Sequence, residues 1–281
     1  MLSAEGISPR RRHGQNFLLD ENLLASIVRD AELSPGSSVL EIGPGPGLLT
    51  RHLLSAGHRV IAVEIDAGMS RVAQRVLAPV AEQLTWIEAD ALVGRRLGAE
   101  LDAQLGSVSA LVANLPYNIS GPLLAALFTH RDLPERMVVL VQKEMAERLL
   151  AEPGGRQWGS LSVLRAVTMK GRTLRRVPPG AFWPAPKVDS AVIRLDRLSD
   201  LPSPEALDGL QRFLALAFHN RRKTLLNSVS EASGERPGRV LERLGASNFQ
   251  QKIRAEAANA VQLCALAHSW AVSAPGERDR P

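Results

Sequence analysis

The stretch Glu41-Ile42-Gly43-Pro44-Gly45-Pro46-Gly47-Leu48-Leu49-Thr50 joins a β-rich run at 38–41 to an amphipathic segment at 48–56. The run is short and bounded by glycines, which predicts a strand, and the segment has helical spacing. Glycines at alternate positions let the connecting backbone approach a ligand closely. Open α/β sheets bind ligands where such loops leave the carboxyl ends of strands. The stretch therefore predicts an α/β fold with a ligand site after this strand.

Short β-rich runs alternate with helical segments through the first two-thirds of the chain. Strands are expected at 38–41, 59–64, 84–88, 109–113 and 137–141, with helices between them such as 48–56 and 69–77. This alternation predicts a mostly parallel, doubly wound sheet. Two later apolar runs are expected to be further strands, at 161–169 and, after a proline-rich loop, at 188–195.

The last part of the chain has a different pattern. A polar, proline-punctuated segment at 199–204 predicts a linker, and helices are expected beyond it at 205–218, 223–230, 238–244 and 255–270. The tail 273–281 is expected to be disordered. We therefore predict an α/β domain with an N-terminal arm over 1–198, a small all-helical domain over 199–272, and a disordered tail over 273–281.

The composition argues against several kinds of protein. Hydrophobic residues make up 45% of the 281 positions, which is enough for a substantial core. One cysteine, Cys264, allows neither an internal disulfide nor a multi-cysteine zinc site, and the six histidines lack metal-ligand spacing, so no metal is expected. No apolar run could span a bilayer, and no apolar region of a secretory signal follows the arginines at 10–12. A mitochondrial leader would have little room before Gly14, so a cytoplasmic protein is expected.

The glycine stretch differs from the dinucleotide fingerprint. A Gly-x-Gly-x-x-Gly pattern starting at Gly43 would require glycine at position 48, which is leucine. Pro44 and Pro46 also remove two backbone amides that a pyrophosphate would use at a helix N-terminus. A ligand without phosphates therefore fits the loop better, and an unrelated Rossmann-like nucleotide binder is the alternative.

Two carboxylates follow the next two expected strands. Glu64 ends the second strand, about 20 residues after the glycines, where a carboxylate can accept hydrogen bonds from a ribose diol. Asp90 follows the third strand and can accept a hydrogen bond from an adenine amine. Together with the glycines, these residues predict a site for an adenosine-bearing ligand, and S-adenosylmethionine is the favoured one.

The tetrapeptide Asn114-Leu115-Pro116-Tyr117 follows the apolar run that ends at residue 113. It suits the presentation of an aromatic amine to an electrophile, because acceptors around the two N–H groups favour the geometry in which nitrogen attacks. The Asn114 side-chain oxygen is one such acceptor, and the Leu115 carbonyl can be another where Pro116 fixes the backbone. Tyr117 can stack on the base. An ordinary strand-to-loop turn is the alternative interpretation.

These separated blocks closely resemble the ribosomal RNA adenine N6-dimethyltransferases. That family includes the bacterial enzyme of small-subunit rRNA, its eukaryotic relatives, and the macrolide-resistance methyltransferases of large-subunit rRNA. The resemblance runs from about residue 14 to about residue 230. It implies a Rossmann-like, S-adenosylmethionine-dependent methyltransferase domain over 1–198 and a helical RNA-binding domain over 199–272. It also implies the transfer of two methyl groups to N6 of adenine.

The resemblance also implies roles for individual residues. The block Gly14-Gln15-Asn16-Phe17-Leu18 is similar to the family's N-terminal block, which touches the methionine part of the cofactor. The implied cofactor-binding residues are Gln15, Asn16, Leu18, Gly43, Gly45, Glu64, Ile65, Asp90, Ala91 and Asn114. The block at 182–190 is similar to a later family motif, in which Phe182 stacks on a flipped adenine opposite Tyr117. The implied catalytic residues are Asn114, Leu115, Pro116, Tyr117 and Phe182.

Two blocks look like the small-subunit branch of the family: Asn118-Ile119-Ser120 and the stretch Phe218-His219-Asn220-Arg221-Arg222-Lys223-Thr224-Leu225. One departure is Trp158, where relatives of this branch often carry tyrosine. A large-subunit, macrolide-resistance methyltransferase is the alternative enzyme. A non-catalytic ribosome-assembly or transcription factor that keeps the fold is the alternative from another class.

Basic residues suggest where RNA binds. The net charge of +5 weakly favours a polyanionic partner, and the stretches 170–187 and 209–230 contain no carboxylate. Such charge contacts phosphates and positions a substrate; a solvated basic face is the alternative. The expected RNA-binding residues are Arg175, Arg176, Lys187, Arg221, Arg222 and Lys223. The expected partner is small-subunit rRNA within a pre-ribosomal particle, bound by a monomer with no membrane association.

Overall fold

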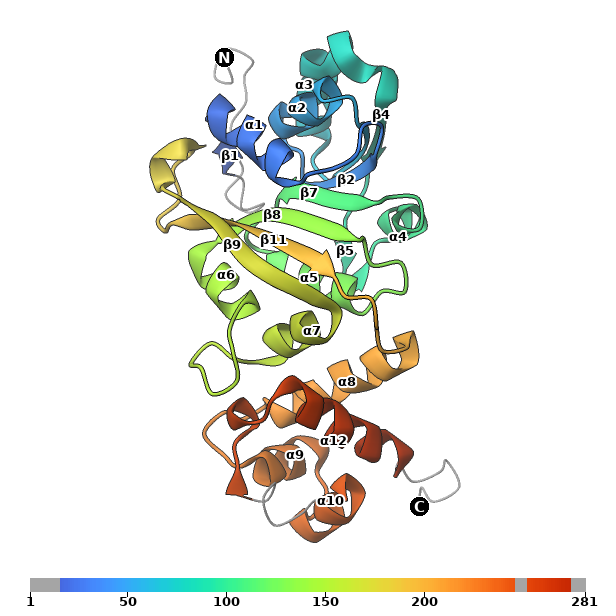
Figure 1. Cartoon of the computed structure of the whole chain (residues 1–281), viewed down its shortest axis with the longest axis vertical. Coiled ribbons are helices and arrows are strands. Elements are labelled where there is room, and N and C mark those ends of the chain that lie inside the picture. The colour runs from blue at the N-terminus through green and yellow to red at the C-terminus, as the bar shows by residue number, and fades with distance from the viewer. Residues whose placement is uncertain (1–15, 246–251, 274–281) are drawn as a thin grey trace. The chain divides into compact units, whose positions relative to one another are not determined.

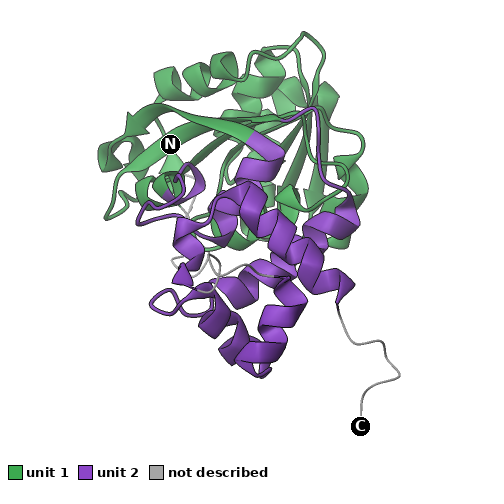
Figure 2. Ribbon diagram, turned by 60° about the horizontal axis from the view of Figure 1, so that its bottom comes forward, with its two compact units in different colours: residues 1–147, 170–197 green, residues 148–169, 198–281 purple. Residues whose placement is uncertain are grey.

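The structure is a computed structural model that describes residues 16–245 and 252–273 (Figure 1). The chain divides into two compact units (Figure 2). Unit 1 comprises residues up to 147 together with 170–197, and unit 2 comprises 148–169 together with residues from 198 onward. Three parts of the sequence discussed above lie outside the described residues: the arginines at 10–12, Gln15, and the tail beyond Ser273.

Unit 1 is built on a seven-stranded sheet with the order β4-β3-β2-β7-β8-β11-β9. The strands are β2 (Ser38–Ile42), β3 (Arg59–Glu64), β4 (Leu84–Glu88), β7 (Ala110–Asn114), β8 (Arg136–Gln142), β9 (Met169–Val177) and β11 (Ser190–Arg197). The strands β4, β3, β2, β7 and β8 pair in parallel, whereas β11 pairs with β8 antiparallel. The predicted mostly parallel sheet is confirmed.

Helices connect the strands of this sheet. They are α1 (Glu21–Asp30), α2 (Leu48–Ser55), α3 (Ala67–Leu77), α4 (Ala99–Leu105), α5 (Ser120–Phe128) and α6 (Lys143–Leu149), with a 3-10 turn η3 (Ala78–Gln83). The apolar faces of α1, α2 and α3 form one core cluster with the central strands, in which Leu53, Val112 and Val138 are fully buried. The central strands are mostly apolar because they are buried on both faces.

Two short strand pairs complete unit 1. The strand β1 (Phe17–Leu18) pairs antiparallel with β10 (Phe182–Trp183), directly after the 3-10 turn η4 (Pro179–Ala181). The strand β5 (Leu92–Val93) pairs with β6 (Arg96–Leu97). The first pair brings together segments that lie more than 160 positions apart along the chain, beside the glycine stretch.

Unit 2 is helical. Its elements are α7 (Ser160–Thr168), α8 (Pro204–Ala217), α9 (Leu225–Ser233), α10 (Pro237–Leu244), the 3-10 turn η5 (Ala255–Ala257) and α12 (Ala260–Val272). Capping defines several helix starts. The Ser203 side chain accepts from the Ala206 N–H at 3.2 Å, and the Asn259 side chain accepts from the Gln262 N–H at 2.9 Å. No helix among the described residues is long and apolar enough to cross a membrane.

The strand predicted at 161–169 is wrong, because residues 160–168 form helix α7. Apolar and β-branched residues in this run favoured a strand, but Val163, Leu164 and Thr168 are buried on a helix that contacts α8 and α12. The strand β9 was not expected at all. Its exposed face carries Lys170, Arg172 and Arg176. Charged side chains are common on an edge strand such as β9, and here they leave no apolar run from which a strand could be predicted.

Residues 148–169 pack with the C-terminal helices, whereas the sequence analysis placed them in the domain 1–198. Trp158 shows why. Its side chain is buried, and its indole N–H donates to the carbonyl oxygen of Ala258 at 3.0 Å. Arg221 likewise donates to the carbonyl oxygen of Arg156 at 2.8 Å. These contacts join segments that are far apart in the sequence, so a boundary drawn along the chain does not find them.

Candidate active site

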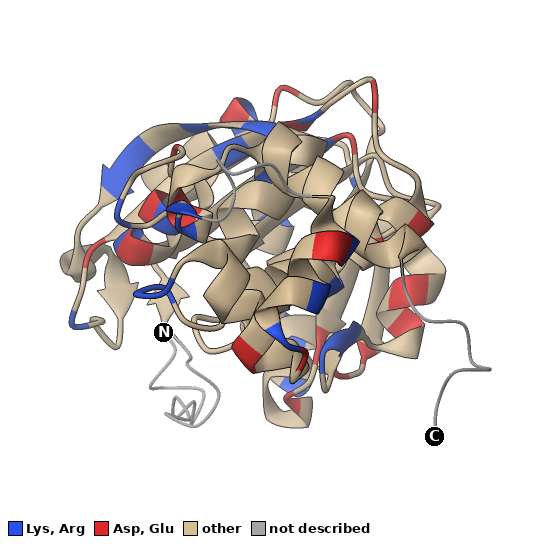
Figure 3. Ribbon diagram, turned by 90° about the horizontal axis from the view of Figure 1, so that it is seen from below, with Lys and Arg blue, Asp and Glu red and all other residues tan. Residues whose placement is uncertain are grey.

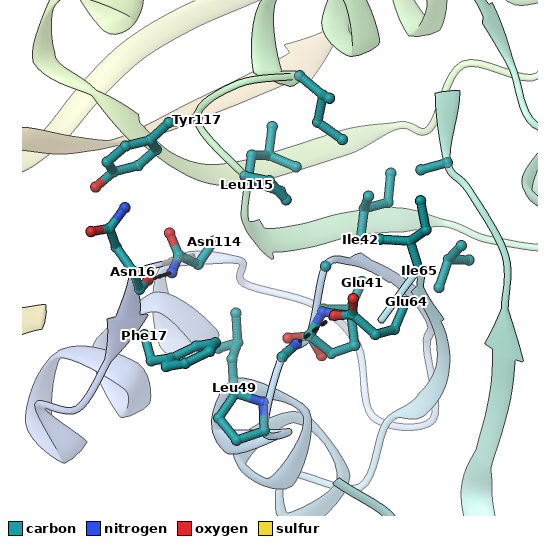
Figure 4. A pocket seen from close by; sticks show the side chains of 18 of the residues that line it. Asn16, Phe17, Glu41, Ile42, Leu49, Glu64, Ile65, Asn114, Leu115 and Tyr117 are labelled. Atoms are coloured by element: carbon teal, nitrogen blue, oxygen red, sulfur yellow. Dashed lines mark hydrogen bonds between the residues drawn. The ribbon is translucent and has the colours of Figure 1, made fainter. Parts of the chain in front are cut away.

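A cavity of about 270 Å³ lies at the carboxyl ends of β2, β3, β4 and β7 (Figure 4). Every described residue that the resemblance assigned to the cofactor lines this cavity: Asn16, Leu18, Gly43, Gly45, Glu64, Ile65, Asp90, Ala91 and Asn114. Gln15 lies outside the described residues. Parallel strands bring their carboxyl ends to one edge of a sheet, which is why residues spaced so widely along the chain meet here.

The loop between β2 and α2 forms one wall of the cavity. Its glycines adopt positive φ angles, 68° at Gly43 and 56° at Gly45. A Cβ atom at Gly43 would lie 2.7 Å from Cγ of Pro116, and one at Gly45 would lie 2.9 Å from Cε1 of Phe17. Both positions therefore require glycine for two reasons, the backbone conformation and the close neighbours.

Glu64 ends strand β3 with a buried carboxylate. One oxygen accepts from the Gly45 N–H at 3.0 Å and the other from the Asp66 N–H at 2.8 Å. Burial raises the pKa of this carboxyl, and the backbone donors act in the opposite direction. Each carboxylate oxygen can accept a second hydrogen bond, so Glu64 can fix the glycine loop and still receive two ribose hydroxyls.

Glu41 is a cavity residue to which the sequence analysis gave no role. Its side chain is buried at the end of β2, and the Thr50 hydroxyl donates to it at 2.7 Å. Burial raises the pKa of Glu41 to about 8, opposed by the Thr50 hydrogen bond, with a further small rise from the charge of Glu64. Glu41 is therefore protonated at neutral pH. The signal that could have revealed it was a carboxylate ending an otherwise apolar strand.

The part of the cavity lined by Ile65, Asp90 and Ala91 can hold an adenine ring. Ile65 is half exposed, although it is apolar, and the buried Ala91 belongs to the same lining. Asp90 is exposed, with one carboxylate oxygen accepting from the Leu92 N–H at 2.9 Å and the other oxygen available as an acceptor. An apolar surface beside an acceptor is the arrangement that a flat ring with an amine substituent requires.

Asn114 and Tyr117 lie on the other side of the cavity, beside Asn16 (Figure 4). The Asn114 side-chain N–H donates to the carbonyl oxygen of Asn16 at 3.0 Å. The Asn114 side-chain oxygen is buried and has no hydrogen-bond partner within the described part of the chain. A buried acceptor without a partner costs about 1–3 kcal/mol, so this oxygen indicates a ligand that donates an N–H. The Tyr117 hydroxyl shares a hydrogen bond of 2.6 Å with Ser190, which fixes the ring.

Phe182 is not in the lining of the cavity. Its ring is buried in the main core cluster, where β10 places it opposite Leu18 and where Tyr117 also packs. The structure thus brings Phe182 close to the site but does not expose its ring to it. A clamp in which Phe182 and Tyr117 hold an adenine between them stays a prediction.

The basic residues expected to bind RNA fall into two groups; Figure 3 shows the charged residues along the ribbon. Three form ion pairs: Arg175 with Asp30, Arg221 with Glu256 at 3.3 Å, and Lys223 with Glu231 at 3.0 Å. The exposed side chains of Arg176, Lys187 and Arg222 form no ion pair with any described residue. The partner carboxylates are those of Asp30, Glu231 and Glu256, which lie outside the two basic stretches. The absence of acidic residues within each stretch therefore did not reveal these ion pairs.

The sheet order, the glycine loop and the acidic strand ends around one cavity define a Rossmann-like methyltransferase that uses S-adenosylmethionine. The residues fit this cofactor, since the described lining offers the acceptors Glu64, Asp90 and Asn114 beside apolar side chains such as Ile65. A family model described as "Ribosomal RNA adenine dimethylase" matches residues 7–264, and the chain belongs to this family. No group of three or more His, Cys, Asp or Glu side chains that could hold a metal is found among residues 16–245 and 252–273.

Curated relatives agree with this assignment. The chain is 41% identical to the ribosomal RNA small subunit methyltransferase A of Phenylobacterium zucineum, over 96% of this chain and 90% of that protein. It is also 41% identical to the protein of that name from Magnetococcus marinus, over 96% and 94%.

Two solved structures are similar over most of their length. The dimethyladenosine transferase of Plasmodium falciparum has a TM-score of 0.69 and 27% identity, covering 89% of this chain and 95% of that one. The 23S rRNA methyltransferase ErmE has a TM-score of 0.58 and 25% identity, covering 91% and 100%.

Proposed function

We propose that this enzyme transfers two methyl groups to N6 of adenines in small-subunit ribosomal RNA. The observation that carries the proposal is the buried, unpartnered side-chain oxygen of Asn114, next to a cavity suited to S-adenosylmethionine. An exocyclic adenine amine supplies the donor that this oxygen lacks. The names of the relatives at 41% identity support the small subunit as the source of the RNA.

Asn114 orients the amine for attack. Its side-chain oxygen accepts one N6–H, while its N–H is held by the Asn16 carbonyl, so the amide cannot turn. Fixing the N–H directions directs the nitrogen lone pair away from the ring plane. Bound S-adenosylmethionine would supply a methyl group on its sulfonium, with S-adenosylhomocysteine as the leaving product and the proton of the alkylated amine passing to solvent. The amine becomes acidic only as it is alkylated, so the chain needs no strong general base at this point.

Tyr117 holds the target base. The hydrogen bond to Ser190 fixes its ring beside Asn114, where it can stack on an adenine that has left its helix. Stacking of this kind is worth about 1–3 kcal/mol per base. We propose that Phe182 contributes from the other side once a side-chain movement exposes its ring.

On the cofactor, we propose that Glu64 holds the ribose, Asp90 the adenine amine, and Asn16 and Leu18 the methionine part. The placement of all four in one cavity supports this division. The glycine loop helps to position Glu64, because the Gly45 N–H donates a hydrogen bond to its carboxylate.

RNA contacts are proposed for residues of both units. Arg176 and Lys187 of unit 1 and Arg222 of unit 2 are exposed, and their guanidinium or ammonium groups can meet phosphates. The helical residues 199–272 would then be the RNA-binding domain, with 148–169 packed against them. We further propose that the protein acts as a monomer in the cytoplasm, on a pre-ribosomal particle.

The test offers labelled S-adenosylmethionine with unmethylated small ribosomal particles and, separately, with naked large-subunit rRNA. We expect two methyl groups per target adenine in the particles and none in the large-subunit RNA. Incorporation only into large-subunit RNA would reject the small-subunit proposal and favour the alternative, a macrolide-resistance methyltransferase, which the likeness to ErmE makes the second candidate. No incorporation into either would favour a non-catalytic factor.

A further inference from the structure

The strand pair β1–β10 has two different faces. Phe17 lies opposite Trp183, and Leu18 lies opposite Phe182. Side chains of directly paired residues share a face of a sheet, and successive residues alternate between faces. One face of this small sheet therefore carries Phe17 and Trp183, and the other carries Leu18 and Phe182. The pair is extended by a hydrogen bond from the Leu19 N–H to the Ala181 carbonyl at 3.0 Å.

Each face contacts a different part of the site. Leu18 and Phe182 enter the main core, against which Tyr117 packs. Phe17 and Met69 of α3 form a separate buried cluster, and Trp183 and Val72 pack on it. The strand pair thus connects the residues around the proposed target base with the residues around the cofactor.

Phe17 is held between an aromatic ring and the glycine loop. Its ring stacks on Trp183, with centroids 6.5 Å apart and planes at 30°. The Phe17 ring also approaches Gly45 so closely that a Cβ atom there would lie 2.9 Å from its Cε1 atom. Phe17 lines the cofactor cavity, but Trp183 is not one of the lining residues. Trp183 therefore does not line the cavity itself, and its stacked neighbour Phe17 does.

We propose that Trp183 is a positioning residue for the cofactor: it holds the Phe17 ring against Gly45 and so fixes the N-terminal wall of the site. The same wall includes Asn16, whose carbonyl oxygen accepts from Asn114. Without the indole, Phe17 loses its stacked aromatic neighbour and keeps its contacts with Met69 and Gly45. The N-terminal wall and the glycine loop are then less firmly fixed relative to one another. Binding of the cofactor has to order them, which weakens its affinity.

The experiment compares wild type with Trp183→Ala and Trp183→Phe. The dissociation constant for S-adenosylhomocysteine is measured by calorimetry without RNA, and KM for S-adenosylmethionine and kcat are measured with small ribosomal particles. Loss of one aromatic pair predicts that Trp183→Ala raises the dissociation constant and KM by about fivefold to tenfold, with kcat unchanged. Trp183→Phe keeps a ring on Phe17 and should remain close to wild type.

A second measurement tests the route through Phe17. In a double-mutant cycle, Phe17→Leu and Trp183→Ala together should raise the dissociation constant no more than the larger single effect, because both remove one contact. Trp270→Phe is the matched control, since Trp270 is a half-buried tryptophan that contacts Phe213 in unit 2. Emission should change on saturation with S-adenosylhomocysteine in wild type and Trp270→Phe, and change less in Trp183→Phe.

A purely structural role makes a different prediction. Trp183→Ala would then lower the thermal unfolding midpoint of the cofactor-free protein and leave the dissociation constant unchanged, which would overturn the proposal. Additive effects in the double-mutant cycle would overturn it as well. If Trp183→Ala does not fold, Trp183→Leu retains apolar bulk without the stacked ring and should show the same loss of affinity.

Discussion

The cavity of unit 1 and the basic segment 221–223 of unit 2 differ in the burial of their polar groups and in the partners of those groups. In the cavity, the Asn114 oxygen is buried without a partner, and Glu41 is buried with a single hydrogen bond from Thr50. In the segment, Arg221 and Lys223 are exposed, yet both have carboxylate partners. The cavity is organised for a ligand before it arrives, whereas most of the charge in the segment supports the protein's own structure.

The largest effect is expected where this preorganisation acts on the reaction. Asn114→Ala removes the proposed acceptor for the adenine amine and should lower kcat by about 10²–10³-fold, as the loss of one preorganised hydrogen bond does elsewhere. RNA affinity should stay within about twofold of wild type, because phosphate contacts dominate it. Filter binding and methyl incorporation on the same particles measure both. A variant as active as wild type would show that the unpartnered oxygen has no part in the reaction.

The next effect is expected at Glu41, and its size depends on pH. Below about pH 4.5 the carboxyl is protonated in both states. Between there and about pH 8 the unfolded chain releases the proton and the folded protein keeps it, so folding becomes less favourable by about 1.4 kcal/mol per pH unit. The stability that Glu41 contributes is therefore present at low pH and is lost as the pH rises through about 8.

Glu41→Gln keeps the shape and an acceptor for Thr50 without the titration. The cofactor-free variant should unfold at higher urea concentration than wild type at pH 8, and the difference should shrink towards pH 4.5. A difference that is constant with pH would show that the buried carboxyl does not titrate in this range. Thr50→Val is the matched control, because it removes the hydrogen-bond donor but not the carboxyl. The stability of this variant should depend more on pH than the stability of wild type does.

The smallest effect is expected in the basic segment. Arg222→Ala should reduce the slope of log affinity for RNA against log salt by about one, since one phosphate contact is lost. Arg221→Ala should leave the slope unchanged and instead lower the unfolding midpoint, because Arg221 joins the Arg156 carbonyl to Glu256. Equal slope changes in the two variants would remove the distinction between free and paired arginines.

The sequence predicted the central strands to within about two residues because short buried runs have a clear pattern. The predicted cofactor residues at the ends of β3 and β7, Glu64 and Asn114, line one cavity because parallel strands bring their carboxyl ends to one edge of the sheet, whereas their roles stay predictions. It did not predict that Arg175 pairs with Asp30 or Arg221 with Glu256, because those partners are far away along the chain. Nor did it predict the burial of Phe182, which depends on pairing with Leu18, or the elevated pKa of Glu41, which depends on its surroundings.

The hydrogen bond from the Asn114 amide to the Asn16 carbonyl has a consequence for base selection if Asn114 holds the target amine as proposed. With its N–H fixed on that carbonyl, Asn114 presents only an acceptor to the incoming base. A deaminated adenine carries a keto oxygen where the amine was, so two acceptors would face each other without a proton between them. Sites that recognise a donor reject analogues lacking it by large factors. The enzyme would therefore discriminate against inosine at the target position by the orientation of one amide.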